Sequence, residues 1–351
     1  MKILFLPKYN LDGPSSRYRT YQYINLFKEK DIVCTISSFY LKGYVRNLYH
    51  KKWLNIMLFP FCILRRIIIT VFSFNYDLVV IEKEAIPYFP PIVEKVLSIF
   101  GKKFILDYDD AVYYNYIYSN NKLVRRLFSN KIESIIKISF GVITGSPELT
   151  EYVKQFNANV IEIPTSVDIE KYNSPSSYIQ KNSPFVIGWI GSISTSRYID
   201  SIQLGLNRFL EEVDDVEIHL IGYNGYLRDE RIKVIKWTSD TEVENLYKMD
   251  VGIMPLIDTP FEHGKCGFKL IQYMACGKST ISTPFDANIK IDSGNGNLFA
   301  LNDDEWFKCF MEVYNSPQKY KDIGCRNKQR VLEEYSIQSN VEKYVNFYHS
   351  I

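Results

Sequence analysis

The sequence lacks any close pairing of its six cysteines, which are scattered and never form a Cys-x-x-Cys motif. This spacing argues against a zinc knuckle or a redox pair, and free thiols in a chain of this length are typical of a reducing cytoplasm. The apolar run at the N-terminus is only Ile3–Leu6 before Pro7, which is too short for a signal peptide. The sequence therefore predicts a cytoplasmic protein.

An excess of charge of one sign is also missing, because 42 basic and 40 acidic residues give a net charge of +2. This balance argues against a nucleic-acid partner for the whole chain. The charge is unevenly distributed, however. Residues 1–150 carry 21 basic and 12 acidic groups, whereas the remainder carries 21 and 28. The asymmetry predicts that the first half faces an anionic surface.

What is present in the 351 residues is a strand–helix alternation that runs twice. Each half begins with a buried-strand run, a Gly/Ser loop and a helical stretch, the opening of a doubly wound α/β sheet. The expected strands are 2–6, 32–37, 78–81, 103–106, 142–144, 185–190, 217–221, 233–235, 251–254 and 279–282, and the longest expected helices are 17–30, 91–100, 123–138, 198–212 and the tail 331–348. The Ser-, Pro- and Asn-rich run Asn173–Pro184 is the expected linker. Ligands of such folds bind where strands end, so a cleft between the halves is the expected site.

Residues 32–76 contain no acidic residue but six basic ones and two apolar runs, 53–64 and 67–74, divided by Arg65 and Arg66. A membrane-spanning helix needs about 20 apolar residues, and two arginines at its centre are costly. Two interpretations remain open: an interfacial segment on anionic lipid, and a buried crossover helix of the first domain.

Three loops have the composition of phosphate-binding loops. The first contains Gly13, Ser15, Arg17 and Arg19; the second contains Gly191, Ser192 and Arg197; the third contains Lys265, Gly267, Phe268 and Lys269. Glycines let the backbone approach an anion, helix N-termini attract it, and cations neutralise it. The alternatives are a simple helix cap and a surface turn with solvated lysines. None has the spacing of an ATPase P-loop or of a dinucleotide fold.

The segment Asp107-Tyr-Asp-Asp110 follows an expected strand. An Asp-x-Asp pair can hold a divalent ion, but an acidic helix N-terminus is the preferred interpretation, and the four histidines are far apart in sequence. The sequence therefore predicts no metal site. It also contains no serine nucleophile elbow.

The second half resembles the nucleotide-binding domain of the family 4 glycosyltransferases, which have the GT-B fold. The residues that carry the resemblance are 187–192 with Arg197, 237–244, 250–256, 264–278, Asn295-Gly296 and the Trp306 helix, with weaker matches at 15–19, 107–110, 144–146 and 163–168. The segment Gly-Lys-Cys-Gly-Phe-Lys at 264–269 is the most specific part of the resemblance.

The resemblance implies two Rossmann-like doubly wound domains facing a central cleft: an acceptor domain at 1–172, a nucleotide-sugar domain at 185–330, and a helix at 331–351 that crosses back to the first domain. It implies a metal-independent hexosyl transfer with retained anomeric configuration and no cofactor besides the nucleotide-diphosphate sugar, with UDP or GDP as the expected nucleotide. The expected acceptor is a glycan or a lipid-diphosphate-linked glycan in bacterial surface-polysaccharide synthesis (O-antigen, capsule or exopolysaccharide), at the inner face of the membrane.

This sequence departs from the family at two pairs of positions. The family's phosphate-binding Arg and Lys fall on Ser192 and Arg197, and its two acidic residues fall on Gly264 and Gln272. Gln272 can still hydrogen-bond ribose hydroxyls, since its amide is both donor and acceptor. Glu262 and Asp258 are candidates to replace the first missing carboxylate.

Roles follow from the resemblance. Arg197, Lys265 and Lys269 are expected to stabilise the departing diphosphate, with backbone N–H groups of Gly191 and Gly267, while Trp237 lies near the base. Asp109 or Asp110 is expected to contact the donor sugar or the acceptor, and Arg17 and Arg19 an acceptor phosphate.

Three other functions remain open at this point: a non-catalytic GT-B protein that binds a nucleotide sugar as an accessory subunit, a sugar-nucleotide epimerase, and a metal-dependent transferase that uses Asp107 and Asp109.

Overall fold

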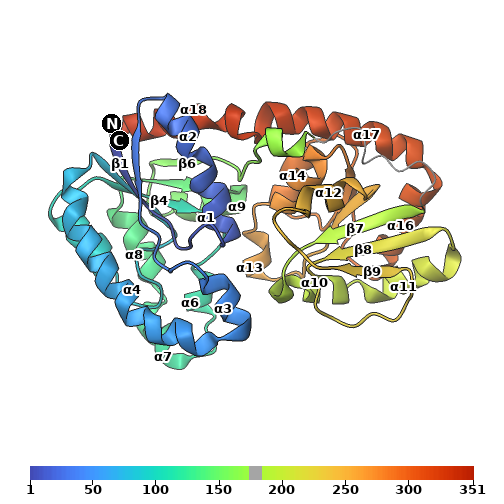
Figure 1. Ribbon diagram of the computed structural model, residues 1–351, viewed down its shortest axis with the longest axis horizontal. Coiled ribbons are helices and arrows are strands. Elements are labelled where there is room, and N and C mark those ends of the chain that lie inside the picture. Colours follow the sequence, from blue (N-terminus) through green and yellow to red (C-terminus); the bar gives the residue numbers. More distant parts are fainter. Residues whose placement is uncertain (174–183) are drawn as a thin grey trace. The chain divides into compact units, whose positions relative to one another are not determined.

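The computed structural model describes residues 1–173 and 184–351, so all but the first and last residues of the expected linker lie outside the described residues. The chain divides into two compact units. Unit 1 comprises residues 1–166, 264–266 and 340–351, and unit 2 comprises the described residues of 167–263 and 267–339 (Figure 1).

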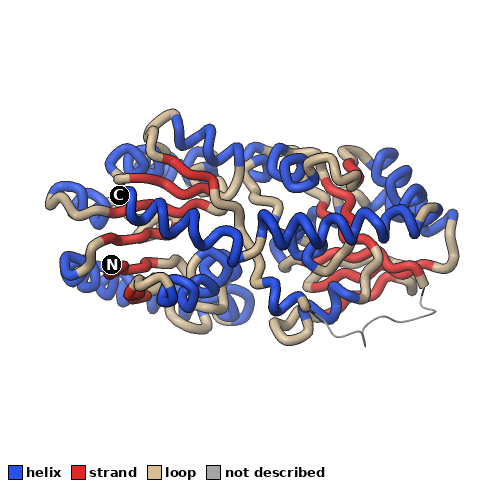
Figure 2. The backbone as a smooth tube through the Cα atoms, turned by 90° about the horizontal axis from the view of Figure 1, so that it is seen from above, coloured by secondary structure: helices blue, strands red, loops and turns tan. Residues whose placement is uncertain are grey.

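Unit 1 is built on a parallel six-stranded sheet in the order β2-β1-β3-β4-β5-β6. Its strands are β1 (Lys2–Leu6), β2 (Val33–Ile36), β3 (Leu78–Glu82), β4 (Phe104–Tyr108), β5 (Gly141–Thr144) and β6 (Val160–Glu162). The three central strands β1, β3 and β4 are almost continuously apolar and buried, as expected where helices cover both faces of a parallel sheet. Figure 2 shows the strands lying between helices.

The helical elements of unit 1 are α1 (Pro14–Arg19), η1 (Tyr21–Tyr23), α2 (Ile24–Glu29), α3 (Tyr44–His50), α4 (Lys52–Phe72), η2 (Ser73–Asn75), α5 (Ile92–Ile99), α6 (Tyr114–Ile117), α7 (Lys122–Phe128), α8 (Lys131–Ile138) and α9 (Pro147–Lys154). Two expected helices are each broken. The helix expected at 17–30 is interrupted at Thr20, whose dihedral angles leave the helical region (φ −120°, ψ −63°). The helix expected at 123–138 is interrupted at Ser129 and Asn130, and only α8 buries an apolar face.

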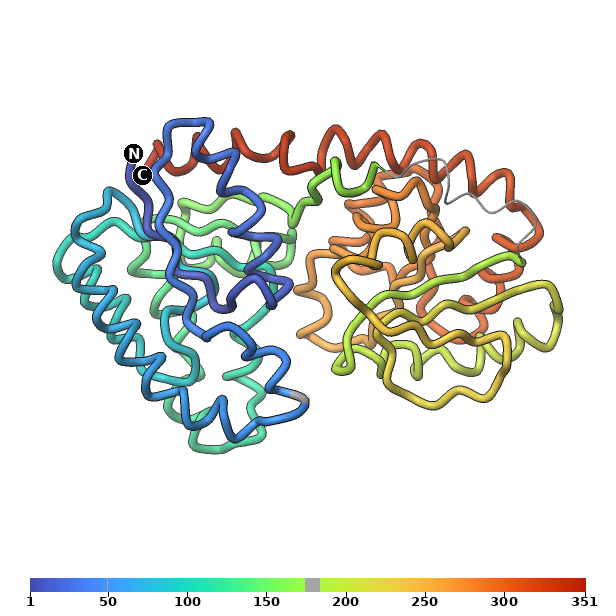
Figure 3. Tube along the Cα trace, in the orientation of Figure 1, coloured from blue at the N-terminus to red at the C-terminus, as the bar shows by residue number. Residues whose placement is uncertain are grey.

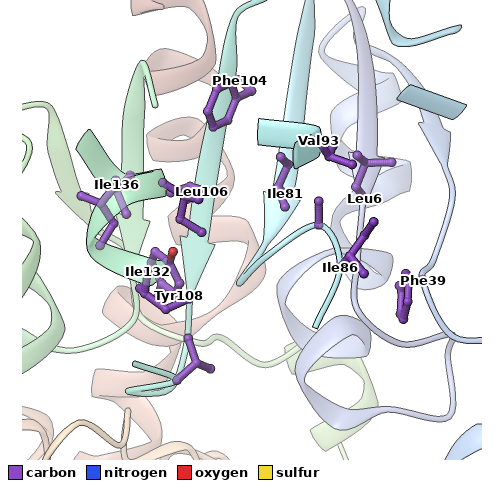
Figure 4. Close-up of a cluster of buried hydrophobic side chains, with 14 of the residues drawn as sticks. Leu6, Phe39, Ile81, Ile86, Val93, Phe104, Leu106, Tyr108, Ile132 and Ile136 are labelled. Carbon is purple, nitrogen blue, oxygen red and sulfur yellow. The ribbon is translucent and has the colours of Figure 1, made fainter. Parts of the chain in front are cut away.

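The core of unit 1 packs helices against the sheet. Ile136 of α8 lies beside Leu106 of β4 and Ile132 beside Tyr108, while Val93 of α5 lies near Leu6 of β1 (Figure 4). The last part of the chain completes this unit, because Tyr348 packs its ring 5.6 Å from Phe27 of α2, and the two chain ends are neighbours in Figure 3.

Unit 2 contains a second parallel six-stranded sheet, in the order β12-β11-β10-β7-β8-β9. Its strands are β7 (Phe185–Ile190), β8 (Val216–Ile221), β9 (Ile232–Ile235), β10 (Val251–Met254), β11 (Ser279–Ser282) and β12 (Leu298–Phe299). Its helical elements are η3 (Ile169–Tyr172), η5 (Ile193–Thr195), α10 (Arg197–Asp200), α11 (Gln203–Glu212), α12 (Glu242–Tyr247), α13 (Pro260–His263), α14 (Phe268–Ala275), α15 (Asp286–Asp292), α16 (Asp303–Asn315), α17 (Pro317–Arg330) and the π-helix η6 (Val331–Tyr335), and α18 (Ile337–Ser350) begins here and ends in unit 1. The two doubly wound sheets confirm the predicted α/β class.

Candidate functional site

The loops at the carboxyl ends of β1, β3 and β4 in unit 1 bring together a buried ionic cluster. The ammonium of Lys83 lies 2.9 Å from Asp109 Oδ1 and 3.3 Å from Asp110 Oδ2. It also donates to the Ser15 hydroxyl over 2.9 Å, and that hydroxyl donates in turn to Asp109. The cluster therefore unites the expected site residues Ser15, Asp109 and Asp110 around a lysine that the sequence analysis did not single out.

Lys83 reaches this position through an uncommon backbone conformation. It follows β3 directly with φ +64°, a left-handed conformation that residues other than glycine rarely adopt. Its N–H donates to the carbonyl of Asp107 over 2.9 Å, which continues the strand pairing past the turn. Strained residues of this kind gather at binding and catalytic sites.

The charges of the cluster depend on one another. Burial acts to raise the pKa of Asp109, but the ammonium of Lys83 and the hydrogen bond from Ser15 outweigh it and hold the pKa below its usual value. Burial likewise acts to lower the pKa of Lys83, but Asp109, Asp110 and Glu82 raise it well above normal. Asp109 is therefore ionised and Lys83 protonated at neutral pH.

Glu82, the last residue of β3, is a second feature that the sequence analysis missed. It is 2% exposed, and neither carboxylate oxygen makes a hydrogen bond of normal geometry in the described structure. Burial raises its pKa to about 7, with Asp109 and Asp107 adding to the effect against the attraction of Lys83. A lone glutamate at the end of an apolar strand gives no sign of this in the sequence.

We expect Glu82 to make stability fall with rising pH. Its pKa is raised from 4.5 to about 7, so the folded state keeps a proton that the unfolded state loses between these values. The free energy of unfolding should fall on the order of 2 to 3 kcal/mol across this interval because of Glu82 alone. Urea unfolding at pH 5 and pH 8 should show this loss in the wild type and not in Glu82→Gln. The exposed Glu151→Gln is the control, and an unchanged pH dependence in Glu82→Gln would contradict the assignment.

Lys265, expected to bind diphosphate, lies in the short segment that belongs to unit 1. Its ammonium is 3.9 Å from Asp110 Oδ1, and its side chain is 17% exposed. Gly264 is required beside it, because a Cβ there would lie 2.5 Å from the Cβ of Ala111. Lys265 therefore joins the Lys83 cluster, and Gly264 has a packing role at the position where the family has a glutamate.

Arg19 of unit 1 has an internal role in place of the expected one. Arg19 was expected to face an acceptor phosphate, but it is 2% exposed and donates to Asp107 Oδ1 over 2.6 and 2.9 Å. Its third bond goes to the carbonyl of Ile163 at 2.7 Å. Arg19 and Asp107 are thus a buried ion pair of the scaffold. Arg17, by contrast, is half-buried with its guanidinium 4.9 Å from the Tyr18 ring centroid.

Gly13 precedes α1 and serves the packing of this loop. A Cβ at Gly13 would lie 2.3 Å from the Cβ of Tyr9, and its N–H donates to the carbonyl of Asn10 over 2.9 Å. The glycine therefore allows the first loop to fold tightly at the carboxyl end of β1.

In unit 2, Arg197 opens α10 with its side chain 59% exposed and its guanidinium 2.6 Å from Glu262 Oε1. Glu262 itself is 1% exposed and also accepts hydrogen bonds from Tyr198 and Thr259. The carboxylate considered as a replacement for the missing family glutamate therefore holds Arg197 in place, and the exposed arginine stays accessible to an anion.

The loop after β7 is shaped by its glycine. A Cβ at Gly191 would lie 2.2 Å from the ring of Trp189. The Gly191 N–H, expected to contact phosphate, already donates to the carbonyl of Ile221 over 2.9 Å. Ser192 is exposed and its N–H donates to the Thr195 hydroxyl over 2.8 Å, which caps η5. Ser192 is one of the exposed residues of this loop, and its hydroxyl lies 3.0 Å from that of Ser194.

The loop before α14 ends in a sharp turn at Gly267. This residue has φ +63°, and a Cβ there would lie 2.3 Å from Ile291 Cδ1 and 2.9 Å from Asn288 Oδ1. Phe268 and Lys269 form the first turn of α14, and both are half-buried. Lys269 thus stands at a helix N-terminus, where the helix dipole also favours an anion.

Gln272, one turn further along α14, is buried and hydrogen-bonded to a carboxylate. Its amide nitrogen donates to Glu242 Oε1 and to the Tyr172 hydroxyl, each over 3.0 Å. The other oxygen of Glu242 accepts from the Trp237 indole over 2.6 Å. Glu242 therefore links the two expected binding residues Trp237 and Gln272, a link that spacing could not reveal because 30 residues separate Glu242 from Gln272.

Comparisons with known proteins give a family match for part of the chain and a fold match for the whole chain. Residues 184–315, most of unit 2, match the family model described as glycosyl transferases group 1. No curated protein sequence matches the chain.

Solved structures match over the full chain, at low sequence identity. HepE of Anabaena, solved with UDP-glucose, has a TM-score of 0.71 and 14% identity and covers 100% of both chains. A glycosyltransferase of Rickettsia africae has a TM-score of 0.69 and 14% identity, and a sucrose-phosphate synthase of Thermosynechococcus elongatus 0.70 and 11%; each comparison covers 99% of this chain and 98% of the other. The likeness confirms the predicted GT-B fold.

Proposed function

We propose that the protein is a retaining glycosyltransferase that moves a hexose from a nucleotide-diphosphate sugar to a glycan or lipid-linked glycan acceptor. The single observation that carries the proposal is the match of residues 184–315 to the group 1 glycosyltransferase model, within a chain of GT-B fold. The similar HepE structure holds UDP-glucose, which supports a UDP-sugar as the donor.

The donor diphosphate is assigned to Lys269 and Arg197. Lys269 combines its ammonium with the N-terminal end of α14, and Arg197 has an exposed side chain whose guanidinium pairs with Glu262. Both would stabilise the negative charge that develops on the departing diphosphate, which is the largest charge change of the reaction. Ser192, exposed in the loop after β7, adds a hydroxyl donor.

The ribose and base are assigned to the Trp237–Glu242–Gln272 group. Gln272 stands where the family has a glutamate, and its amide is held by Glu242 at 3.0 Å. A carboxylate is therefore still present beside this position, supplied by α12 in place of α14. It can accept hydrogen bonds from ribose hydroxyls, as the family's glutamate would. This substitution supports an active donor site in spite of the altered motif.

The acceptor is assigned to unit 1, where Ser15, Lys83, Asp109, Asp110 and Lys265 meet at the strand ends. Asp110 is the most exposed carboxylate of the group, with 31% of its side chain accessible, and can accept a hydrogen bond from a sugar hydroxyl. Lys265 and Arg17 provide positive charge for an acceptor phosphate, as in a lipid-diphosphate-linked glycan. Transfer without a metal ion, cytoplasmic location and a role in surface-polysaccharide synthesis are parts of the same proposal.

A non-catalytic sugar-nucleotide-binding subunit is the second candidate. It is favoured by Gly264 and Gln272, which stand where the family has its two glutamates. Such a protein would bind a donor without turning it over, so measurements of binding and of turnover separate the two candidates.

The donor assignment is tested by thermal unfolding in the presence of UDP-, GDP-, ADP- and dTDP-sugars with a metal chelator. A ligand that binds only the folded state raises the unfolding temperature, by an amount that grows with its concentration above Kd. We expect a rise with UDP-sugars, and a smaller one for Arg197→Ala. The exposed Arg208→Ala, also paired with an acidic residue in unit 2, is the matched control. If no nucleotide sugar raises the unfolding temperature, the donor site is contradicted.

A further inference from the structure

The helix α4 presents an apolar face to solvent. Every exposed residue between positions 53 and 72 is apolar. These are Trp53, Ile56, Met57, Leu58, Pro60, Phe61, Leu64, Ile67, Ile68, Val71 and Phe72, and Ile56 and Met57 are 73% and 69% exposed. They recur every three or four positions, so they lie along one side of the helix. In Figure 1, α4 runs along the outer edge of unit 1.

After Lys52 at its start, the polar residues of α4 face the protein instead. Its buried residues are Cys62, Arg66 and Thr70, one turn apart. Arg66 donates to the carbonyls of Ser37 and Pro7 over 3.1 and 3.2 Å, and Arg65 donates to the carbonyls of Ser38 and Phe39. The helix is therefore amphipathic in the reverse sense to a helix of a soluble domain, which faces its polar side to water.

The apolar surface continues onto the neighbouring helix of unit 1. The ring of Phe74, just after α4, makes an edge contact with Phe100 at a centroid distance of 6.0 Å. Phe100 and Ile99, at the end of α5, are 70% and 78% exposed. Apolar surface that extends over two elements marks an interaction site, whereas single exposed apolar residues do not.

Positive charge borders this surface. Residues 32–76 contain no acidic residue, and Lys42, Arg46, Lys51 and Lys52 before and at the start of α4 are all exposed. Of the residues that the structure describes, Lys52–Asn75 also forms one helical segment long and apolar enough to cross a membrane. Apolar side chains flanked by cations are the combination that binds anionic lipid surfaces.

We propose that α4 lies in the plane of an anionic bilayer surface, with its exposed face inserted among the lipids and the lysines before it on the headgroups. The bonds of Arg65 and Arg66 to four backbone carbonyls keep one side of the helix against unit 1, whereas a spanning helix would have to leave these partners. Arg65 and Arg66, which would make a membrane-spanning helix costly, thus hold an interfacial helix against unit 1. This inference does not depend on the proposed sugar transfer.

The charge of the surface favours lipid over a second copy of the chain. Two copies paired through α4 would bring together two segments with cations and no carboxylate, so no intermolecular ion pair could form within them. An anionic bilayer supplies the missing negative charge, and each lysine near its surface strengthens binding about fivefold.

The test is flotation of the full chain with vesicles of phosphatidylcholine alone and with added phosphatidylglycerol, at low and high salt. We expect binding to the anionic vesicles, weakened by salt. The double variant Ile56→Glu/Leu64→Glu should bind at least tenfold more weakly. The matched control is Leu204→Glu/Leu301→Glu, two exposed leucines of unit 2, which should bind as the wild type does.

Trp53 gives an independent readout of insertion. It lies on the exposed face of α4, whereas Trp189 and Trp306 are buried in unit 2. Lipids brominated on the upper part of the acyl chain should quench its fluorescence, and Trp53→Phe should abolish that quenching without loss of folding. Bromine near the chain ends should quench less, because an interfacial helix inserts only about 5–10 Å.

Three results would overturn the proposal. The first is equal flotation of the wild type and the Ile56→Glu/Leu64→Glu variant. The second is that lipids brominated near the chain ends quench Trp53 fluorescence most strongly. Trp53 would then lie at the bilayer centre, as in a spanning helix. The third is a dimer in vesicle-free solution that the double variant dissociates, with no flotation of the wild type, which would assign the surface to a second copy.

Discussion

Replacing Lys269 with alanine should lower kcat/KM for the donor by about 30- to 1000-fold. The reason is the loss of one donor that stabilises the departing diphosphate, worth about 2–4 kcal/mol in the transition state by analogy with removal of a single oxyanion donor. Lys269 lies in the first turn of α14, where the helix dipole acts in the same direction. Steady-state kinetics with the donor that stabilises the protein most strongly would measure the effect.

Lys248→Ala is the matched control for this variant. Lys248 is an exposed lysine of unit 2 that pairs with Glu244 one turn away on the helix surface. Surface pairs of this kind contribute little to stability or function, so its kcat/KM should stay close to the wild-type value. If Lys269→Ala behaved in the same way as Lys248→Ala, the diphosphate would have to bind elsewhere.

Replacing Lys83 with methionine should produce the largest loss of stability among the site variants. The substitution removes the ammonium from a buried cluster and leaves Asp109, Asp110 and Glu82 close together. Removing one partner of a buried ion pair costs about 3–5 kcal/mol, because the remaining charge is buried without compensation. Hydrogen exchange of the β3 and β4 amides would measure this loss locally in unit 1.

The pH dependence gives this prediction a second readout. In the wild type the pKa of Asp109 is held below its usual value, so its contribution to stability is present at neutral pH and lost in acid. Without Lys83, only the Ser15 hydrogen bond and the charge of Arg19 still oppose burial, so the pKa of the Asp109 carboxylate should rise. The destabilisation by Lys83→Met should therefore be larger at pH 7.5 than at pH 5. Lys137→Met, which removes an exposed lysine paired with Glu133, should have little effect at either pH.

The fold was predictable because most of its strands are buried on both faces. Runs such as Leu78–Ile81 and Val251–Met254 are apolar, short and bounded by turns or charged residues, and the structure places strands at both. The strands that escaped prediction are β6 and β12, which are three and two residues long and only half-buried. Their pairing depends on neighbouring strands and not on a local apolar run.

The site was predictable only in part, because motif spacing reveals loops and not the partners that fold against them. Ser15, Asp109 and Asp110 were expected and do come together, but Lys83 joins them through a left-handed turn that no residue type announces. In the sequence, Arg19 is a cation in a loop of phosphate-binding composition. In the structure it is buried and pairs with Asp107, so it is a scaffold residue. The role of Glu242 could not be predicted for the same reason, because its contact with Gln272 forms only when the chain folds.

The most direct test of sugar transfer is donor turnover followed by proton NMR with a metal chelator present. In the absence of acceptor, we expect slow transfer of the hexose to water, with release of the nucleoside diphosphate. The freed sugar should first appear in the anomeric configuration of the donor, and Lys269→Ala should slow its formation. A donor that binds and stabilises the protein but shows no turnover, with or without lipid-linked acceptor, would contradict the account and identify a sugar-nucleotide-binding subunit.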